Sequence, residues 1–218
     1  MIHPLFRDRA HAGQVLAKRL KRIAAPSQPL VLGLPRGGVP IAFEIARELG
    51  ADLDIFLVRK LGVPGQEELA MGAIASGGAK VLNEALIRRL RISSEEISEI
   101  VAREEREIVR REALYRAGLP PLPIESRVVV LVDDGLATGA SMLAAVHAVR
   151  QHNPTSVTIA VPVAAKDACE DLRREADEII CAFSPEPFYA VGAWYEDFSQ
   201  TTDGEVRRLL QHAMHENL

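Results

Sequence analysis

An uninterrupted apolar run that ends in two carboxylates constrains the fold of this 218-residue chain most strongly. Residues 128–132 read VVVLV, and a strand that is apolar at every position is typical of a parallel sheet with both faces covered. Asp133, Asp134 and the small residues of GLATGAS follow it, and residues 139–149 have the pattern of a helix. The carboxyl end of such a strand faces the ligand crevice of an open α/β sheet, and a helix start favours an anion. We therefore expect this turn to hold a phosphate beside a polyhydroxylated, metal-bound group.

The rest of the chain alternates helix and strand patterns, which indicates an α/β fold with an open parallel sheet flanked by helices. Expected helices cover residues 7–22, 39–49, 166–176 and 203–215, and expected strands cover residues 30–34, 53–58, 156–161 and 178–183. We expect one domain over residues 1–218, with a core at about 24–61 and 126–200. The insertion between them, residues 62–125, would form a small hood or flap.

The insertion has structural signals of its own. Ser93 and Glu96 form a capping box, so a long helix is expected over residues 95–117, and the proline-rich GLPPLP ends it. The charge run REEREIVRR within this helix mixes both signs at helical spacing, which is typical of a paired, solvated face. This face could also pack against a second subunit. Residues 71–82 predict a β-hairpin that turns at Gly77 and Gly78.

Composition excludes several classes of protein. The net charge of −4, without a dense basic run, argues against nucleic-acid binding. Cys169 and Cys181 are too few for a disulfide framework or a zinc site, and no apolar window reaches the length of a membrane span. A cytoplasmic protein is therefore expected. The chain lacks the G-x-S-x-G and HExxH motifs, so an acyl or phosphoester hydrolase is the weakest alternative.

Two further segments have the character of ligand loops. GLPRGGVP, residues 33–40, follows an expected strand and opens a helix, so its N–H groups and the Arg36 guanidinium suit a diphosphate. Residues 58–72 start at a strand end and become glycine-rich and polar. We expect this second segment to be a loop that opens and closes.

Together these segments resemble the type I phosphoribosyltransferases, whose motif for phosphoribosyl diphosphate (PRPP) is an apolar strand, an acidic pair and a Thr-Gly loop. The resemblance implies that Asp133 and Asp134 contact the ribose hydroxyls of PRPP, directly or through Mg²⁺. It places the 5′-phosphate among Ala137, Thr138, Gly139, Ala140 and Ser141. It spans nearly the whole chain and is strongest to a group of phosphoribosyltransferases of unassigned acceptor, marked by FRDRAHAG, GLPRGGVP, VRKLG and DDGLATG.

The resemblance also implies roles for the other two loops. Arg36, Gly37 and Gly38 would hold the diphosphate, and a mobile catalytic loop would bring Lys60 to it, with Arg59 as the second candidate. Arg36, Lys60 and Asp134 are then the expected catalytic residues, because cations stabilise the leaving diphosphate while a carboxylate fixes the ribose and its metal. Mg²⁺ is the expected cofactor.

The acceptor side is less defined. Residues 188–200, FYAVGAWYEDFSQ, resemble the tail of purine-salvage enzymes, which implies acceptor contacts from Val191, Trp194, Tyr195 and Asp197. A lone tryptophan near the last strand is as often part of the core or of a subunit interface. Ala137 stands where enzymes for 6-oxopurines usually carry an aspartate, which argues against that substrate class.

The expected function is Mg²⁺-dependent transfer of a 5-phosphoribosyl group from PRPP to an unidentified, nitrogenous acceptor with release of diphosphate, as in nucleotide salvage. The alternative is a PRPP-binding or nucleotide-binding regulator without catalysis, because the sequence names no general base. The expected partners are small molecules, namely PRPP, diphosphate and a base. A homodimer could form, whereas nucleic acid and membrane are not expected.

Overall fold

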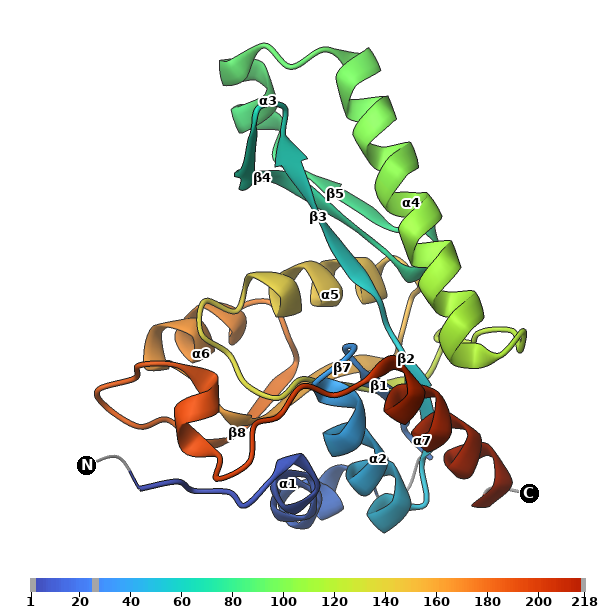
Figure 1. Ribbon diagram of the computed structural model, residues 1–218, viewed down its shortest axis with the longest axis vertical. Coiled ribbons are helices and arrows are strands. Elements are labelled where there is room, and N and C mark those ends of the chain that lie inside the picture. The colour runs from blue at the N-terminus through green and yellow to red at the C-terminus, as the bar shows by residue number, and fades with distance from the viewer. Residues whose placement is uncertain (1–2, 25–27, 217–218) are drawn as a thin grey trace.

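The computed structural model describes residues 3–24 and 28–216, and its centre is a five-stranded sheet between two layers of helices (Figure 1). The strand order is β2-β1-β6-β7-β8. All four neighbouring pairs are parallel. The strands are β1 (Leu30–Gly33), β2 (Asp52–Ile55), β6 (Val128–Val132), β7 (Ser156–Val163) and β8 (Glu178–Phe183). The prediction of an open parallel sheet flanked by helices is confirmed.

Helices cover both faces of this sheet, which explains the continuous apolar run of β6. One face carries α1 (Arg9–Ala24), α2 (Gly38–Leu49) and α7 (Asp203–Glu216), and the other carries α5 (Ala140–Arg150) and α6 (Lys166–Leu172). Within β6, Val130 and Val132 pack in the cluster that contains α1 and α2, whereas Val129 and Leu131 pack in the cluster that contains α5. All four side chains are fully buried, so a polar residue at any of them would face a core.

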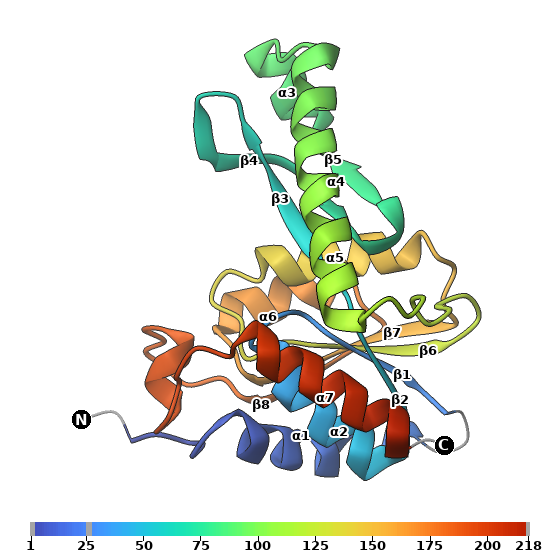
Figure 2. The ribbon, with the colours of Figure 1, turned by 45° about the vertical axis from the view of Figure 1, so that its right-hand side comes forward.

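The insertion forms a hood that stands on the core above α5 (Figure 2). Its antiparallel sheet contains β3 (Val58–Val63), β4 (Gln66–Ala75) and β5 (Lys80–Leu82), and its helices are α3 (Glu84–Leu90), which was not predicted, and α4 (Ser94–Arg116). The capping box is confirmed: the Ser93 hydroxyl accepts from the Glu96 N–H, and the Glu96 carboxylate accepts from the Ser93 N–H at 2.9 Å. Among the described helices, none has the length and apolarity needed to cross a membrane.

Two predictions about the start of the hood are wrong. The expected strand over residues 53–58 is two strands, because β2 ends at Ile55 and Val58 already begins β3 in the other sheet. Residues 58–72, expected as a loop, form most of a hairpin of β3 and β4 in which Val63 pairs with Gln66. Backbone pairing with β4 stabilises this glycine-rich segment, and irregular register around Gly62 hides the strand pattern in the sequence. The second hairpin is confirmed, with a 3₁₀ turn at Ser76–Gly78 before β5.

A buried ion pair attaches the C-terminal end of α4, where the hood returns to the core, to β2. Arg116, the last residue of α4, donates from Nε to Asp54 Oδ1 of β2 at 2.9 Å, and both side chains are buried. The Leu122 N–H donates to Asp54 Oδ2 at 3.0 Å and the Ile55 N–H to Oδ1 at 2.7 Å. A charge pair with its remaining oxygens satisfied is the form in which buried charge is tolerated. The hood is therefore joined to β2 both along the chain and through Arg116.

Candidate functional site

The strand order reverses between β1 and β6, and the name crevice is used here for the carboxyl edge of the sheet at this reversal. The chain leaves β1 toward β2 on one side and leaves β6 toward β7 on the other, so the order reverses between these two strands. In open α/β sheets, ligands bind at the carboxyl edge beside this reversal. The loops that leave the two strands there are residues 34–37 and 133–139, which contain two of the three predicted ligand segments. Segments far apart in the sequence thus meet at one edge of the sheet.

Gly37 and Gly38 allow the two loops to touch. A methyl group on Gly37 would lie 1.9 Å from Asp134 Oδ2. On Gly38 it would lie 2.4 Å from the Val132 carbonyl oxygen and 3.0 Å from the Asp133 Cα. Side chains at either position would collide with the acidic loop, so both positions require glycine. The predicted diphosphate loop therefore lies directly against the predicted ribose and metal residues.

The acidic pair at the end of β6 is held where charge is disfavoured. Burial raises the pKa of Asp133, and the neighbouring charge of Asp134 raises it further. Burial also raises the pKa of Asp134, although hydrogen bonds from Arg9 oppose this shift. The Asp134 N–H donates to Asp133 Oδ1 at 2.8 Å, which fixes the first carboxylate against the turn. A bound cation or a set of hydroxyl donors would relieve the repulsion between the two groups.

Arg9 is a residue of this site that sequence reasoning missed. Its Nε and Nη2 donate to Asp134 Oδ2 at 3.0 and 2.8 Å, and its Nη1 donates to the Ser199 carbonyl oxygen at 2.7 Å. The guanidinium carbon lies 4.0 Å from the centre of the Phe198 ring. The signal that could have found it is its place in the FRDRAHAG motif, to which no role was given.

The predicted phosphate loop is pinned at one residue and open at the others. The buried Leu136 donates its N–H to the Val163 carbonyl oxygen at 2.9 Å, and its own carbonyl oxygen accepts from the Ala165 N–H at 2.9 Å. Exposed residues surround Gly139, the N-cap of α5, which has φ 72° and, within the described chain, caps the helix without a side-chain hydrogen bond. These exposed residues are Ala137, Thr138, Ala140 and Ser141. The Ala140 N–H donates to the Thr138 hydroxyl oxygen at 3.5 Å, and the start of α5 with the exposed Thr138 and Ser141 hydroxyls remains accessible to an anion.

Two of the predicted diphosphate cations form ion pairs with the hood and the C-terminal helix. Arg36 Nη1 lies 3.6 Å from Asp203 Oδ1 at the start of α7. The Tyr115 hydroxyl donates to the same oxygen at 2.7 Å, and burial together with this bond raises the pKa of Tyr115 to about 12. Arg59 Nη2 lies 2.7 Å from Glu104 Oε2. Glu104 is buried, although the sequence predicts a solvated face for its part of α4. The difference arises because Glu104 forms its ion pair with Arg59 of β3, on the inner side of the hood, and not with solvent.

Lys60 has a different set of neighbours. It lies on β3, and its Nζ donates to the Glu68 carbonyl oxygen at 3.0 Å and lies 3.4 Å from the Glu68 carboxylate. With Ala140 and Ser141 it lines a cavity of about 300 Å³ between the hood sheet and α5. The fold therefore brings Lys60 to the start of α5 and Arg36 to the junction of α4 and α7.

The acidic pair can hold only part of a metal coordination shell. Over residues 3–24 and 28–216, no cluster of three or more His, Cys, Asp or Glu side chains could hold a metal ion by itself. Mg²⁺ is usually bound by one or two carboxylates together with substrate phosphates and water, which is the number that Asp133 and Asp134 offer. The residues present therefore fit an ion that arrives with a phosphorylated substrate.

The tail over residues 188–200 supports the acidic loop from behind. Trp194 and Tyr195 are buried, and the Tyr195 hydroxyl donates to the Asp134 carbonyl oxygen at 2.6 Å. The Trp194 carbonyl oxygen accepts from the N–H groups of Leu5 and Phe6 at 2.9 and 3.0 Å. This packing favours the alternative in which Trp194 belongs to the core.

The remaining tail residues are more accessible. Val191 packs against the acidic loop, because a methyl group on Gly135 would lie 2.5 Å from its Cγ1. Asp197 is exposed and accepts from the Ser199 N–H at 2.8 Å, which lowers its pKa. Tyr189, which sequence reasoning did not single out, is 68% exposed. An open aromatic face in this tail thus belongs to Tyr189 rather than to Trp194.

Known proteins resemble this chain over almost its full length. A model of the phosphoribosyl transferase domain matches residues 8–183. Two Mycobacterium tuberculosis proteins, each named "Putative phosphoribosyl transferase", are 43% identical over 209 residues, which cover 96% of this chain and 47% of each relative. The chain thus spans about half the length of these curated relatives.

Solved structures with a similar fold support the family match. The crystal structure of TT1426 from Thermus thermophilus has a TM-score of 0.85 at 45% identity and covers 95% of this chain and 98% of that chain. A hypothetical protein from Neisseria gonorrhoeae, solved with bound ppGpp, has a TM-score of 0.51 at 12% identity over 97% of this chain and 98% of that one, and so shares the fold alone. The chain therefore belongs to the phosphoribosyl transferase domain family and has the fold of the type I phosphoribosyltransferases.

Proposed function

We propose that this chain transfers the 5-phosphoribosyl group of PRPP to a nitrogenous acceptor, with release of diphosphate, in a Mg²⁺-dependent reaction. One observation carries the proposal: an acidic pair, the start of α5 and a glycine loop with an arginine lie at the same carboxyl edge of the sheet, where the strand order reverses. The acidic pair suits a ribose, the helix start suits a 5′-phosphate, and the glycine loop with its arginine suits a diphosphate.

The donor would lie across the crevice in an order set by the loops. The 5′-phosphate binds the N–H groups at the start of α5 and the hydroxyls of Thr138 and Ser141. The ribose hydroxyls would bind Asp133 and Asp134, and the same two carboxylates would hold the metal. The diphosphate binds the backbone of residues 36–38 and the guanidinium of Arg36, which must then leave Asp203. Lys60 adds positive charge to the donor phosphates from the hood side.

The reaction exchanges one bond at C1 of the ribose for another. A lone pair on the acceptor nitrogen forms the new bond, while the bond from C1 to the diphosphate oxygen breaks and its electron pair leaves with the diphosphate. Arg36 and Lys60 stabilise the negative charge of the leaving group, and the carboxylates face the positive charge that develops on the sugar ring. When bound, Mg²⁺ neutralises part of the diphosphate charge. The hood limits access of water, which would otherwise compete with the acceptor.

The acceptor side of the proposal rests on the tail and on the phosphate loop. Val191 lies against the acidic loop, and Tyr189 offers an exposed ring that could stack on a base. Asp197 is exposed and could make a polar contact. Alanine at position 137 argues against 6-oxopurines, so other nitrogenous bases and small amines are the acceptors to test first.

Calorimetric titration of PRPP in the presence of Mg²⁺ tests the donor site. We expect binding by the wild-type chain and a loss of at least about tenfold in affinity, equivalent to ~1.4 kcal/mol, for Asp134→Asn and for Arg36→Ala. Arg150→Ala is the matched control, because Arg150 has similar exposure but lies at the opposite end of α5, bound to Glu175 and Asp177. The proposal would be overturned if the wild-type chain does not bind PRPP in this titration.

Diphosphate release tests catalysis separately. PRPP and Mg²⁺ are incubated with a panel of purines, pyrimidines, pyridines and small amines, and diphosphate is measured over time. Release with one acceptor identifies both the reaction and its substrate. Binding of PRPP without release for any member of the panel would instead favour the regulatory alternative.

A further inference from the structure

We infer that Arg9 is a positioning residue for Asp134: it holds one carboxylate oxygen so that the other faces the ribose or its metal. The inference rests on the proposed function, because it assigns the task of orienting the acidic pair within that same site. Arg9 lies far from Asp134 in sequence, at the start of α1, and only the fold brings the two together.

The geometry of the guanidinium carries the inference. Two of its nitrogens, Nε and Nη2, donate to a single oxygen, Asp134 Oδ2, while Nη1 is bound to the main chain at Ser199. Because both bonds go to Oδ2, they set the rotation of the carboxylate and direct Oδ1 away from Arg9. The Arg9 and Asp134 side chains are only 11% and 18% exposed, so water screens this pair weakly. The planar fork makes these three contacts together, which a lysine could not do.

Three neighbours of the pair make the arrangement rigid. The Phe198 ring lies under the guanidinium, and Gly37 leaves so little space that any side chain there would strike Oδ2. The Tyr195 hydroxyl holds the main-chain oxygen of Asp134 at 2.6 Å. The side chain and the main chain of Asp134 are therefore held independently, the first by Arg9 and the second by Tyr195.

The two supports belong to segments that are themselves joined. Phe6 and Tyr195 form a parallel bridge, and the N–H groups of Glu196 and Asp197 donate to the Phe6 and Arg7 carbonyl oxygens, both at 2.8 Å. The start and the end of the chain thus form one support behind β6. Removal of the guanidinium would leave two adjacent carboxylates without this counter-charge, and Asp134 would be free to rotate.

A double-mutant cycle on PRPP affinity tests the inference, with Mg²⁺ present and the full chain used throughout. We expect Arg9→Ala to weaken binding at least about tenfold and Arg9→Lys to fall between Arg9→Ala and wild type. In the Asp134→Asn background, Arg9→Ala should add less than a twofold loss, because its effect acts through that carboxylate. Arg7→Ala is the matched control. Arg7 has the same charge and lies two residues away, but its contacts in the structure are made by its main chain. It should bind within twofold of wild type.

Four outcomes would contradict the inference. Losses from Arg9→Ala and Asp134→Asn that multiply in the double variant would show that Arg9 acts elsewhere. A lower melting temperature for Arg9→Ala with unchanged PRPP affinity would reduce Arg9 to a structural role. If Arg9→Ala does not fold, the same cycle with Arg9→Lys decides, and wild-type affinity for Arg9→Lys would then overturn the inference. If the wild-type chain does not bind PRPP in the first titration, both the proposed function and this inference are wrong.

Discussion

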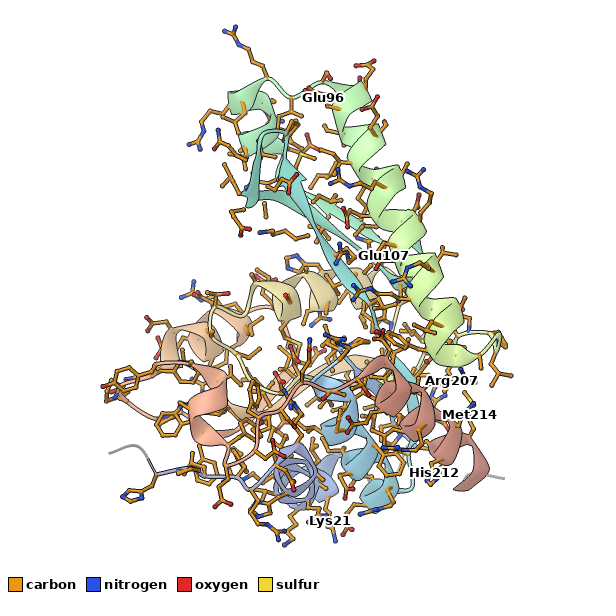
Figure 3. The ribbon with its side chains drawn as sticks, viewed as in Figure 1. Lys21, Glu96, Glu107, Arg207, His212 and Met214 are labelled. Atoms are coloured by element: carbon orange, nitrogen blue, oxygen red, sulfur yellow. The ribbon has the colours of Figure 1, made fainter. Side chains whose placement is uncertain are left out.

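In the hood, the Glu107 carboxylate accepts hydrogen bonds from Arg110 and Arg111, whereas in the crevice, Asp133 lies beside a second carboxylate. The two arginines lower the pKa of Glu107 to about 2, while burial and Asp134 raise the pKa of Asp133. Figure 3 places Glu107 on α4, with Glu96 at the start of the same helix, far from the core. Charge on the hood helix stabilises the fold, but charge in the crevice opposes it. Groups kept at a cost to stability are characteristic of a functional site.

The largest expected effect is the difference between replacing a glycine in the crevice and replacing a glycine in the hood. Gly37→Ala forces a methyl group against Asp134 Oδ2, where the ideal Cβ would lie 1.9 Å away, so we expect a loss of about 1–3 kcal/mol in unfolding free energy. PRPP affinity in calorimetry should fall at least about tenfold, because the acidic loop must shift. Gly118→Ala, after the hood helix, is the control: Gly118 has φ 87° and open space around it. It should cost about 1 kcal/mol and leave PRPP affinity unchanged. Equal PRPP affinities for the two variants would show that the acidic loop is no more sensitive to an added methyl group than the end of the hood helix.

A smaller effect concerns the pH dependence of stability in the crevice. A carboxyl group whose pKa is raised by folding contributes stability below its unfolded pKa, near 4, and this contribution disappears as the pH rises through the folded pKa. Asp133→Asn does not titrate and keeps the oxygen that accepts from the Asp134 N–H. Relative to wild type, it should therefore gain about 1 kcal/mol or more between pH 5 and pH 8 in urea unfolding without ligand.

The control for this measurement is Asp171→Asn, on the exposed surface of α6. It should give the same difference from wild type at both pH values. PRPP affinity provides the second readout, since Asp133→Asn should bind PRPP more weakly even where it is more stable. A wild-type curve that rises in parallel with that of Asp133→Asn would mean that the crevice carboxyl is not destabilised by burial.

The smallest effect has the opposite sign and lies in the hood. Folding lowers the pKa of Glu107, so its contribution is present above the unfolded pKa, near 4, and is lost as the pH falls toward 2. Glu107→Gln should lower the unfolding free energy at pH 7 by only about 0.3–1 kcal/mol, because the pair is partly exposed. The difference from wild type should shrink below pH 4, whereas the exposed neighbour Glu105→Gln should be neutral throughout. A difference that grows in acid would contradict this sign.

Local pattern was sufficient for the central motif and its setting. The run over residues 128–132, the acidic pair and the small-residue turn predict a strand, a crevice edge and a helix start, and all three elements are present. Each of these features depends on neighbours within a few residues, as does the capping box at Ser93. The same is true of the Arg36 loop, which the sequence places after a strand and before a helix.

The features that sequence reasoning missed depend on pairing that the local pattern does not show, and two of them involve partners far along the chain. Residues 60–63 look like a glycine-rich loop by themselves, but pairing with β4 makes them a strand. Trp194 could be read as a ligand platform or as core, and its contacts with the first residues of the chain favour the core. The sequence predicts that Arg59 is available to a ligand, but in the folded chain it forms an ion pair with the buried Glu104.

The amino-acid pattern is sufficient to predict an α/β chain with an inserted hood and a candidate donor-binding turn, because periodicity, capping and turn chemistry are local properties of the backbone. Which groups face one another at that turn depends on how the whole chain folds. The tertiary structure places Arg9 on Asp134, Gly37 against the same carboxylate and Tyr195 behind it. These contacts join segments that lie far apart in the chain, because close packing of the sheet with its helices, rather than spacing in the sequence, selects such pairs.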